Sequence, residues 1–437
     1  MEVYYVPFEG ATIVYRPLRQ LAFVGNHALA EYIRRRIAGA NPPRDDDIER
    51  FLDSIQFWNG EADPTGGQLP DLDKFLPTTA VLLMTNQCSM RCTYCYANAG
   101  VHKPEAITWP VAKTVIDAVC ENGRKSGKRH FSLALHGGGE PTTCWSTLEA
   151  AVSYARSRDT PCHISLSSNG VWSASQRSYI CENVDNISLS MDGIESVQNH
   201  QRPLAKGGES FGTVMASLRA LDEAGADYGI RMTVTSDTIA ELPKGVEFIC
   251  RNTKARAIQV EPTFTSSRGV YADVTDAFGN AFTARFLEAY EIGKAANRFV
   301  YYSAARPWVI SSMFCMAPAE ALIVVPGGDL VACFEVYSSR LPYACDFTIG
   351  RIRPEGVAMD FDALARFVAT QQQRRATCRG CYCYWHCCGD CATRSKASTT
   401  GNSVRCHITR TITRDLLGTY IAEGNGVWLG GGHTHPT

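Results

Sequence analysis

Between about residues 79 and 300, short apolar runs alternate with helix-length amphipathic segments, and this alternation limits the possible fold more than any other feature. Each run is followed by a helical pattern, such as VAKTVIDAVCENG or FGTVMASLRALDEAG. The pattern predicts six strand–helix units in a parallel sheet with right-handed crossovers, either an open doubly wound sheet or a barrel. In both architectures functional residues gather at the carboxyl ends of the strands. The six runs are AVLLMT, FSLALH, HISLSS, ISLSMD, IRMTVT and AIQVEP.

Three further regions flank the predicted sheet, which we assign to residues 76–305. Residues 1–75 combine three short alternating stretches with two helical patterns, the first beginning after Asn26, and they predict a small α+β unit of βββαα order. Residues 306–412 are rich in cysteine and short of long periodic segments, which is typical of a metal-stapled module. Residues 413–437 are assigned to a C-terminal tail, whose Gly-rich end GNGVWLGGGHTHPT is expected to be mobile.

Composition excludes several classes of protein. The chain has 437 residues, of which 45% are hydrophobic and 20% charged, as in ordinary globular proteins. Its 43 basic and 44 acidic residues leave a net charge of -1, which argues against binding nucleic acid through bulk charge. No apolar run approaches the ~18 residues that a membrane helix needs, and the start MEVYYVPFEG lacks the features of a signal peptide. We therefore expect a cytoplasmic protein with no membrane or nucleic-acid partner.

Eighteen cysteines are unusual in a cytoplasmic chain, because thiols there are kept reduced and disulfide frameworks are rare. Metal or iron–sulfur ligation is therefore the leading interpretation. Thirteen of the cysteines fall in groups near residues 88–95 and 315–406, while five are scattered. The scattered Cys120, Cys162, Cys181 and Cys250 lie in apolar segments and are predicted to be small buried hydrophobic residues.

The first cysteine group, Cys88, Cys92 and Cys95, follows the first predicted strand with the spacing C-x3-C-x2-C. Thiolates two to four residues apart can converge on one metal centre. Three of them leave one position of a cubane iron cluster, or of a zinc ion, open for a ligand or substrate. The spacing alone does not decide between zinc and an iron–sulfur cluster.

Polar and Gly-rich loops follow the next three strands. HGGGEPT follows the second, where the glycines at 137–139 let the backbone approach a ligand and Glu140 can accept a hydrogen bond from an ammonium group. SSNG follows the third strand and SMDG the fourth, with QNHQRP shortly after. The sequence thus predicts a ligand site at the strand ends, next to the three thiols.

With these loops, the cysteine motif resembles the radical S-adenosylmethionine superfamily. The resemblance implies that the three cysteines hold the 4Fe-4S cluster that binds S-adenosylmethionine (SAM), and that the loops hold SAM itself. Gln198 stands where one subgroup usually carries histidine. The residues matching the motifs are Tyr94 before the last cysteine, Gly138, Gly139 and Glu140 of GGE, Ser168 and Asn169 of TNG with serine for threonine, and Ser190, Asp192 and Arg202 of S-x-D-G…R.

The second cysteine group resembles the SPASM domain of that superfamily. Cys315, Gly328 and Cys333 fit the first half of its pattern, and the second half is met by Cys378, Cys381, Cys387, Cys391 and Cys406. The resemblance implies two auxiliary iron–sulfur clusters and makes a zinc ribbon a poor alternative. One would be held by Cys378, Cys381, Cys387 and Cys406, and the other by Cys315, Cys333 and Cys391, which is either open or closed by Cys345. Cys383 and Cys388 fall between motif positions and are interpreted as bystanders.

The resemblance implies a partial (β/α)6 radical SAM barrel and an enzyme. It would cleave SAM reductively to a 5′-deoxyadenosyl radical, and that radical would abstract hydrogen from a ribosomally made peptide, leading to a crosslink, epimerisation or oxidation. Electrons would come from a flavodoxin- or ferredoxin-type donor. Three alternatives stay open: a protein oxidase of the anaerobic sulfatase-maturating type, a radical enzyme acting on a sugar or small metabolite, and a non-enzymatic iron–sulfur scaffold.

The βββαα order of residues 1–75 resembles the winged-helix-like domain that captures leader peptides in peptide maturases. Three strands ending at Gly25 would leave one edge unpaired, where an extended peptide can add as a further strand. Arg34, Arg35 and Arg36 would favour an acidic leader. The alternative is that this unit is a structural cap without a binding role.

Overall fold

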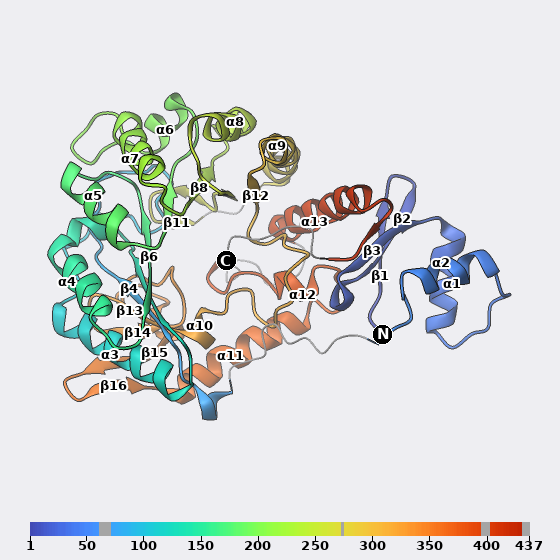
Figure 1. Cartoon of the computed structure of the whole chain (residues 1–437), viewed down its shortest axis with the longest axis horizontal. Coiled ribbons are helices and arrows are strands. Elements are labelled where there is room, and N and C mark those ends of the chain that lie inside the picture. Colours follow the sequence, from blue (N-terminus) through green and yellow to red (C-terminus); the bar gives the residue numbers. More distant parts are fainter. Residues whose placement is uncertain (61–70, 272–274, 395–402, 431–437) are drawn as a thin grey trace.

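The computed structural model describes residues 1–60, 71–271, 275–394 and 403–430. A curved sheet with helices on its outer side forms one end of the molecule, and the N-terminal unit forms the other (Figure 1). The C-terminal helices α11–α13 lie between them. None of the helices in the described ranges is both long and apolar enough to cross a membrane.

The six predicted strands form the centre of an eleven-stranded sheet. Each pairs in parallel with the next one along the chain, so their spatial order follows the sequence. A doubly wound sheet would reverse its strand order at a switch point, and this sheet has no reversal among these strands. The parallel α/β prediction is confirmed, in its barrel-like form. The strands are β4 (Thr79–Leu83), β5 (Phe131–His136), β6 (Cys162–Ser168), β7 (Asn186–Ser190), β8 (Tyr228–Val234) and β9 (Ala257–Pro262).

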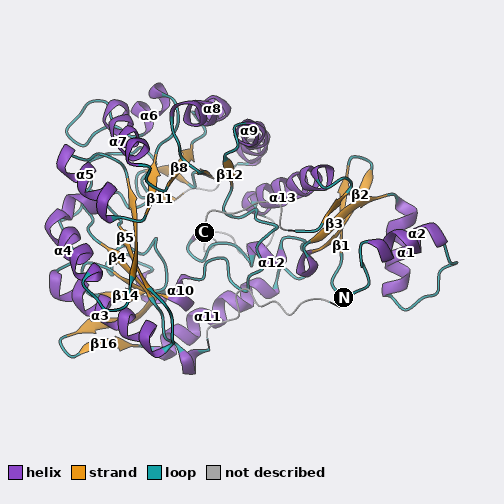
Figure 2. Cartoon of the chain, in the orientation of Figure 1, coloured by secondary structure: helices purple, strands orange, loops and turns teal. Residues whose placement is uncertain are grey.

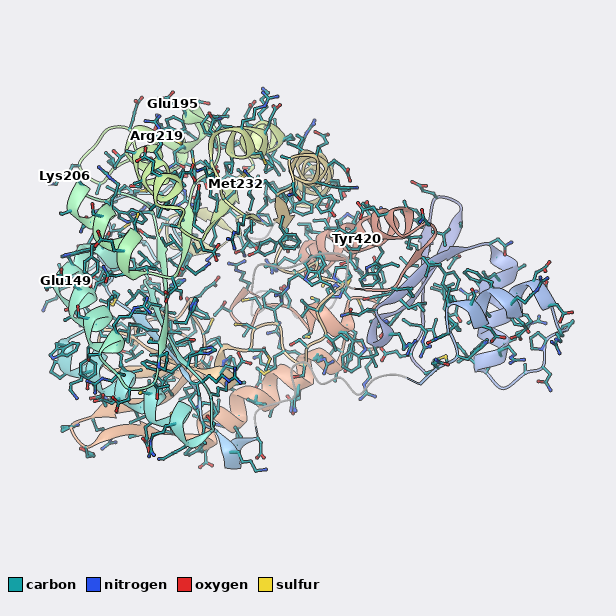
Figure 3. All side chains as sticks on the ribbon, in the orientation of Figure 1. Glu149, Glu195, Lys206, Arg219, Met232 and Tyr420 are labelled. Carbon is teal, nitrogen blue, oxygen red and sulfur yellow. The ribbon has the colours of Figure 1, made fainter. Side chains whose placement is uncertain are left out.

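Helices cover the outer, convex side of this sheet (Figure 2). Charged side chains such as Glu149, Glu195, Lys206 and Arg219 lie on the far side of the helical layer, whereas Met232 lies between sheet and helices (Figure 3). The helices are α3 (Trp109–Lys125), α4 (Trp145–Arg156), α5 (Ala174–Asn183), α6 (Glu195–Gln201), α7 (Phe211–Ala224), α8 (Leu242–Asn252) and α9 (Asp276–Ala295).

The two faces of the strands differ in polarity. In β6, Ile164 and Leu166 are fully buried, while Ser165 and Ser167 alternate with them on the other face. Successive side chains of a strand point to opposite faces, so the apolar set packs against the helices and the polar set lines the concave side. The inside of this partial barrel is therefore polar, unlike the apolar filling of a closed (β/α)8 barrel.

The cysteine-rich region extends the same sheet. β12 (Phe299–Tyr301), which precedes this region, pairs with β9 at one end of the sheet, and β13 (Ala321–Val324), inside the region, pairs in parallel with β4 at the other. The antiparallel strands β14 (Asp329–Val331), β15 (Thr348–Arg353) and β16 (Gly356–Met359) follow β13. This continuity places the cysteine-rich region directly beside the first barrel strand and the cysteine loop that follows it.

The expectation that the cysteine-rich region lacks long elements is wrong. It contains α11 (Phe361–Ala376) and the first part of α13 (Val404–Glu423), helices of 16 and 20 residues. In α13 the buried face includes Arg405, Thr409 and Thr413 among the apolar residues. Buried polar side chains at those positions mask the helical period of apolar residues that sequence analysis relies on.

The N-terminal unit contains β1 (Tyr4–Phe8), β2 (Ala11–Arg16), β3 (Leu21–Gly25), α1 (His27–Ile37) and α2 (Asp46–Ser54), in the predicted order. The side chain of Asn26 caps α1 by accepting a hydrogen bond from the Leu29 backbone N–H at 2.8 Å. A separate apolar core, which includes Phe23, Leu52 and Phe57, holds the helices against the sheet. This part of the unit therefore has its own core, whereas Val6, Ile13 and Tyr15 of the same sheet belong to the main core that includes the barrel.

The assignment of residues 413–437 to a tail needs a correction, because residues 413–430 belong to the fold. The expected boundary at residue 413 falls inside α13, and β17 (Val427–Trp428) pairs antiparallel with β3 of the N-terminal sheet. Leu416, Tyr420 and Trp428 are buried, so apolar burial holds this segment in place. Residues 431–437, the rest of the predicted tail, lie outside the described residues. The strand order β1-β2-β3-β17 means that the edge beside β3, predicted to be unpaired, is partly covered.

Candidate functional site

A cavity of about 670 Å³ opens on the polar, concave face of the sheet. Its wall is built from the carboxyl ends of the barrel strands and from loops of the cysteine-rich region. All of the predicted SAM-contact residues except Asp192 lie on this wall. Two of the three predicted cysteine sets lie there as well: Cys88, Cys92 and Cys95, and Cys315, Cys333 and Cys391.

Each thiol of the first set receives an N–H group. The Met90 backbone N lies 3.4 Å from Cys88 Sγ, and the Ala99 backbone N lies 3.5 Å from Cys95 Sγ. Arg202 Nη1 is 3.9 Å from Cys92 Sγ. Hydrogen bonds to sulfur are one of the means by which proteins tune iron–sulfur clusters. The donors present around these three sulfurs therefore fit a thiolate-ligated cluster.

Burial keeps the thiols of Cys88 and Cys92 protonated in the absence of a metal. It raises the pKa of Cys88 to about 12 and that of Cys92 to about 11. Metal ligands must be deprotonated, so a bound cationic centre would provide the charge that these buried thiolates need. Within the described residues, no group of three Cys, His, Asp or Glu side chains is arranged to hold a single metal ion.

The GGE loop packs directly on the cysteine loop. Gly139 N donates to Thr85 O at 2.8 Å, and Glu140 N donates to Gln87 O at 2.7 Å. A Cβ atom at position 139 would lie 2.0 Å from Gln87 O, which no real side chain tolerates. We expected the glycines to admit a ligand, whereas at position 139 the close approach is to the chain's own backbone.

The carboxylate of Glu140 joins the loops that follow β5 and β6. It accepts hydrogen bonds from Ser168 Oγ at 2.7 Å, from Asn169 N at 2.8 Å, and from Thr142 N and Oγ1 at 3.1 and 2.8 Å. Burial raises the pKa of Glu140, and these four donors oppose that rise. The carboxylate thus uses most of its acceptor capacity within the protein, and its main observed role is to fix the two loops beside the cysteines.

Asp192 supports the site from behind the cavity wall. Its carboxylate pairs with the guanidinium of Arg202, with Nε···Oδ2 at 2.9 Å and Nη2···Oδ1 at 3.1 Å. It also accepts from Tyr94 OH at 2.7 Å and from Thr233 N at 2.9 Å. The carboxylate thus orients Arg202 and Tyr94, which do reach the wall, while the contact of Asp192 with SAM stays a prediction.

Gln198, at the position where a histidine was expected, is fully buried. Its Oε1 accepts from Asp192 N at 2.9 Å, and its Nε2 donates to Ser210 Oγ at 3.1 Å. An amide can accept at one end and donate at the other, which suits both partners at once. Gln198 therefore holds the SMDG loop in position without reaching the cavity wall.

The second cysteine set lies beside a buried ion pair. Thr393 Oγ1 is 3.3 Å from Cys391 Sγ and 4.0 Å from Cys333 Sγ, and it donates to Glu335 Oε2 at 2.8 Å. Arg394 Nη2 lies 2.6 Å from Glu335 Oε1. These contacts bring Cys333, Cys391 and a charged network together on the cavity wall.

The predicted fourth ligand, Cys345, is not among the residues of the cavity wall. It is exposed, and its Sγ lies 3.7 Å from Asp346 Oδ1. Cys388, interpreted as a bystander, does lie on the wall, with Sγ 3.2 Å from Ser311 O. The geometry therefore favours an open position, or Cys388, over closure of this set by Cys345.

The third set, Cys378, Cys381, Cys387 and Cys406, contributes nothing to the cavity wall. Cys387 ends the short helix α12 (Tyr384–Cys387), and Cys406 lies in the first turn of α13. A hydrogen bond from Cys383 lowers the pKa of Cys381 to about 6, which favours a thiolate there. This set is thus separated from the site where a small ligand could bind.

Sequence analysis missed His136, Arg231 and Glu261, which project from β5, β8 and β9 onto the cavity wall. The signal was present as alternation within the strands, since FSLALH and IRMTV place polar residues at every second position. A parallel strand buried on both faces would be apolar throughout. Polar residues on one face therefore indicate a solvent- or ligand-filled interior.

Comparisons with known proteins agree with this geometry. Residues 82–249 match the Radical SAM superfamily. The sporulation killing factor maturation protein SkfB of Bacillus subtilis (strain 168) is 27% identical over 199 residues, which are 45% of this chain and 45% of SkfB. The chain thus spans less than half the length of this relative.

Two solved structures share the fold. The structure of anSMEcpe with bound AdoMet has a TM-score of 0.62 at 17% identity, covering 80% of this chain and 96% of that one. Streptococcus suis SuiB bound to S-adenosylmethionine has a TM-score of 0.52 at 12% identity, covering 91% of this chain and 96% of that one. anSMEcpe has also been solved with AdoMet and Cp18Cys peptide, with a TM-score of 0.59 at 16% identity, covering 80% of this chain and 99% of that one.

Proposed function

The chain contains a radical SAM domain at residues 82–249, and on that premise we propose that it is an enzyme that modifies a peptide by radical chemistry. The observation that carries the proposal is the single cavity that the first cysteine set, the GGE and SSNG loops and the second cysteine set share. A cofactor at the first set and a substrate near the second would then lie in one enclosed space.

In this proposal Cys88, Cys92 and Cys95 hold a 4Fe-4S cluster. When bound, that cluster supplies the electron that cleaves SAM and releases a radical able to abstract hydrogen from the substrate. The protein's own contribution is positional. Glu140 fixes the loops around the cluster, and Arg202, held by Asp192, presents its Nη1 toward Cys92 Sγ. The polar wall then binds SAM and substrate and keeps bulk water away from reactive species.

A peptide is the preferred substrate class for two reasons. SkfB, which is similar over part of the chain, is a maturation protein for a sporulation killing factor. anSMEcpe, which shares the fold, has been solved with a bound peptide.

We further propose that the cysteine-rich region is a SPASM domain with two auxiliary clusters. The set on the cavity wall, with Cys333 and Cys391, would lie close to the substrate, whereas the set that includes Cys387 and Cys406 would lie outside the cavity. The outer set is better placed to exchange electrons with a flavodoxin- or ferredoxin-type partner.

For the N-terminal unit we propose a winged-helix-like role in binding the leader of the peptide. β17 covers only Ala22 and Phe23 of the β3 edge, and Val24 beyond them is 41% exposed. The opposite edge strand, β1, contains Pro7, which lacks an N–H group for pairing. The end of β3 near Val24 is therefore the favoured place for an added peptide strand.

The test of the central proposal is anaerobic reconstitution with iron and sulfide, followed by incubation with SAM and dithionite. Formation of 5′-deoxyadenosine is expected from the purified protein alone. Coexpression with a candidate precursor peptide, followed by mass spectrometry, should then give a mass change that depends on the cysteines of the first set. Absence of deoxyadenosine from cluster-loaded protein would contradict the enzymatic assignment. Turnover of a sugar or small metabolite with no peptide present would contradict the assignment of a peptide substrate.

The leader proposal has its own test. Val24→Glu should place a charge on the β3 edge and reduce modification of the full-length peptide about tenfold, while SAM cleavage without peptide persists. Leu76→Glu is the matched control, since Leu76 is 39% exposed but lies outside the N-terminal sheet. Equal modification by both variants would leave the N-terminal unit as a structural cap.

A further inference from the structure

The cavity wall carries three arginines, Arg202, Arg231 and Arg394. Two of them are neutralised within the protein, Arg202 by Asp192 at 2.9 Å and Arg394 by Glu335 at 2.6 Å. In the described parts of the chain, the guanidinium of Arg231 makes no hydrogen bond and no ion pair. One cation of the wall is thus left without a protein partner.

No acid of the wall forms a hydrogen bond or ion pair with Arg231 in the described residues; Glu261 Oε2, which has no hydrogen bond, lies 3.9 Å from Arg394 Nη1. Arg231 is partly buried, and a partly buried cation is stabilised by an anion or by hydrogen-bond acceptors. The acids and their donors are Glu140 with Ser168 and Asn169, Glu335 with Arg394, Asp390 with Arg405, and Glu261 with Gln259 and the Ser303 backbone N.

The position of Arg231 in the sheet directs it into the cavity. It is aligned with Ser190 of β7 and Gln259 of β9, on the polar face of the strands. Arg202, by contrast, lies against the cysteine loop, with Nη1 3.9 Å from Cys92 Sγ. Arg202 therefore lies beside the first cysteine set, whereas Arg231 lies on strand β8.

A neutral hydrogen-bond donor accompanies Arg231. Burial, together with the charge of Arg231, lowers the pKa of His136 to about 4, so the imidazole is uncharged near neutral pH. Gly137 N donates to His136 Nδ1 at 3.0 Å, which leaves the ring proton on Nε2. His136 thus presents an N–H donor on the same wall as the guanidinium.

We propose that Arg231 binds a carboxylate of the substrate inside the cavity, with His136 as an accompanying donor. The inference deepens the proposed function, on which it rests, by assigning a substrate group to this wall. A guanidinium binds a carboxylate through two parallel hydrogen bonds, which fixes orientation as well as position. In a peptide the carboxylate belongs either to an Asp or Glu side chain or to the C-terminus.

The test measures binding of small probes to reconstituted, SAM-loaded protein by isothermal titration calorimetry. N-acetylalanine carries only a terminal carboxylate, N-acetylaspartic acid α-amide only a side-chain carboxylate, and N-acetylalanine amide neither. At least one acid should bind tenfold or more tightly than the neutral amide, and the tighter acid identifies the source. Arg231→Gln should remove this preference. Arg231→Lys keeps the charge but cannot form the two parallel hydrogen bonds of a guanidinium, so it should retain part of the preference.

Arg251→Gln is the matched control, because Arg251 lies on the outer helix α8 and is exposed. It should keep the full preference for the acid. The inference is overturned if wild-type protein binds all three probes alike, or if Arg231→Gln keeps the preference. It is also overturned if Arg231→Gln weakens SAM binding tenfold and leaves the probe preference intact, since the carboxylate would then be that of SAM. Failure of wild-type protein to form deoxyadenosine would contradict the proposed function separately, because probe binding does not depend on turnover.

Discussion

The first and third cysteine sets differ in spacing and have opposite surroundings. The first set, Cys88, Cys92 and Cys95, lies in a loop on the wall of a polar cavity. Hydrogen bonds from the GGE and SSNG loops hold this loop in place. Cys378, Cys381, Cys387 and Cys406 lie among the C-terminal helices and contribute nothing to that wall. Three thiols that face a cavity leave one coordination position of a cluster open for a small ligand. Four thiols away from the cavity can fill all coordination positions. Access to the cavity, more than cysteine spacing, thus separates a reactive centre from an electron-carrying one.

The largest effect is expected from replacing Cys88, Cys92 and Cys95 together with alanine. With three cubane clusters the protein would hold about 12 iron atoms per chain, and the variant should lose about a third of them. All cleavage of SAM should disappear, because the only set beside the SAM-contact loops is gone. Iron analysis and deoxyadenosine assays measure both. Tightly held zinc with no visible absorbance in the wild-type protein would contradict the account.

Replacing Cys378 and Cys387 with alanine tests the contribution of the third cysteine set. About a third of the iron should again be lost, but cleavage of SAM in the absence of substrate should stay within about threefold of wild type, because these thiols do not reach the cavity. The same two assays apply. Loss of SAM cleavage equal to that of the first variant would show that the two sets are not functionally separate.

Gly139→Ala tests how the first set is positioned. The new methyl group would meet Gln87 O, so the two loops must separate, at a cost of about 1–3 kcal/mol in unfolding free energy. Affinity for SAM should fall about tenfold. Gly212→Ala is the control, since nothing lies within 4 Å of its Cβ position in α7. Equal behaviour of the two variants in thermal unfolding and SAM binding would refute the packing argument.

The smallest effect is expected from Cys345→Ala, because Cys345 is exposed and lies off the cavity wall. Iron content and the visible spectrum should match those of wild type within about 10%, whereas Cys388→Ala should alter the spectrum if Cys388 closes the second set. A loss of iron on removing Cys345 would reinstate it as a ligand.

Local patterns made much of the barrel predictable. Apolar alternation located all six parallel strands, and short motifs located the loops that meet at the cavity, because both signals depend on residues close together in sequence. The pairing of β17 with β3 was not predictable, since two residues carry no strand signal without their distant partner. The isolation of Arg231 was also hidden, because it depends on which acids are already paired elsewhere in the fold.

The role of Asp192 shows a further limit of motif analysis. Its position in the S-x-D-G pattern is conspicuous in sequence, but the structure uses the carboxylate to hold Arg202 and Tyr94 from behind the wall. A motif identifies which residues matter and not which of them touches the ligand. That distinction depends on side-chain direction, which only the assembled loops determine.

The most direct test of the central claim is electron paramagnetic resonance of the dithionite-reduced protein with and without SAM, recorded for two variants. One lacks Cys88, Cys92 and Cys95, and the other lacks Cys378 and Cys387. SAM should change the spectrum of the second variant and leave that of the first unaltered, because Cys88, Cys92 and Cys95 are the set that lies beside the predicted SAM-contact loops. A SAM-dependent change that persists without Cys88, Cys92 and Cys95, or that disappears without Cys378 and Cys387, would contradict the account.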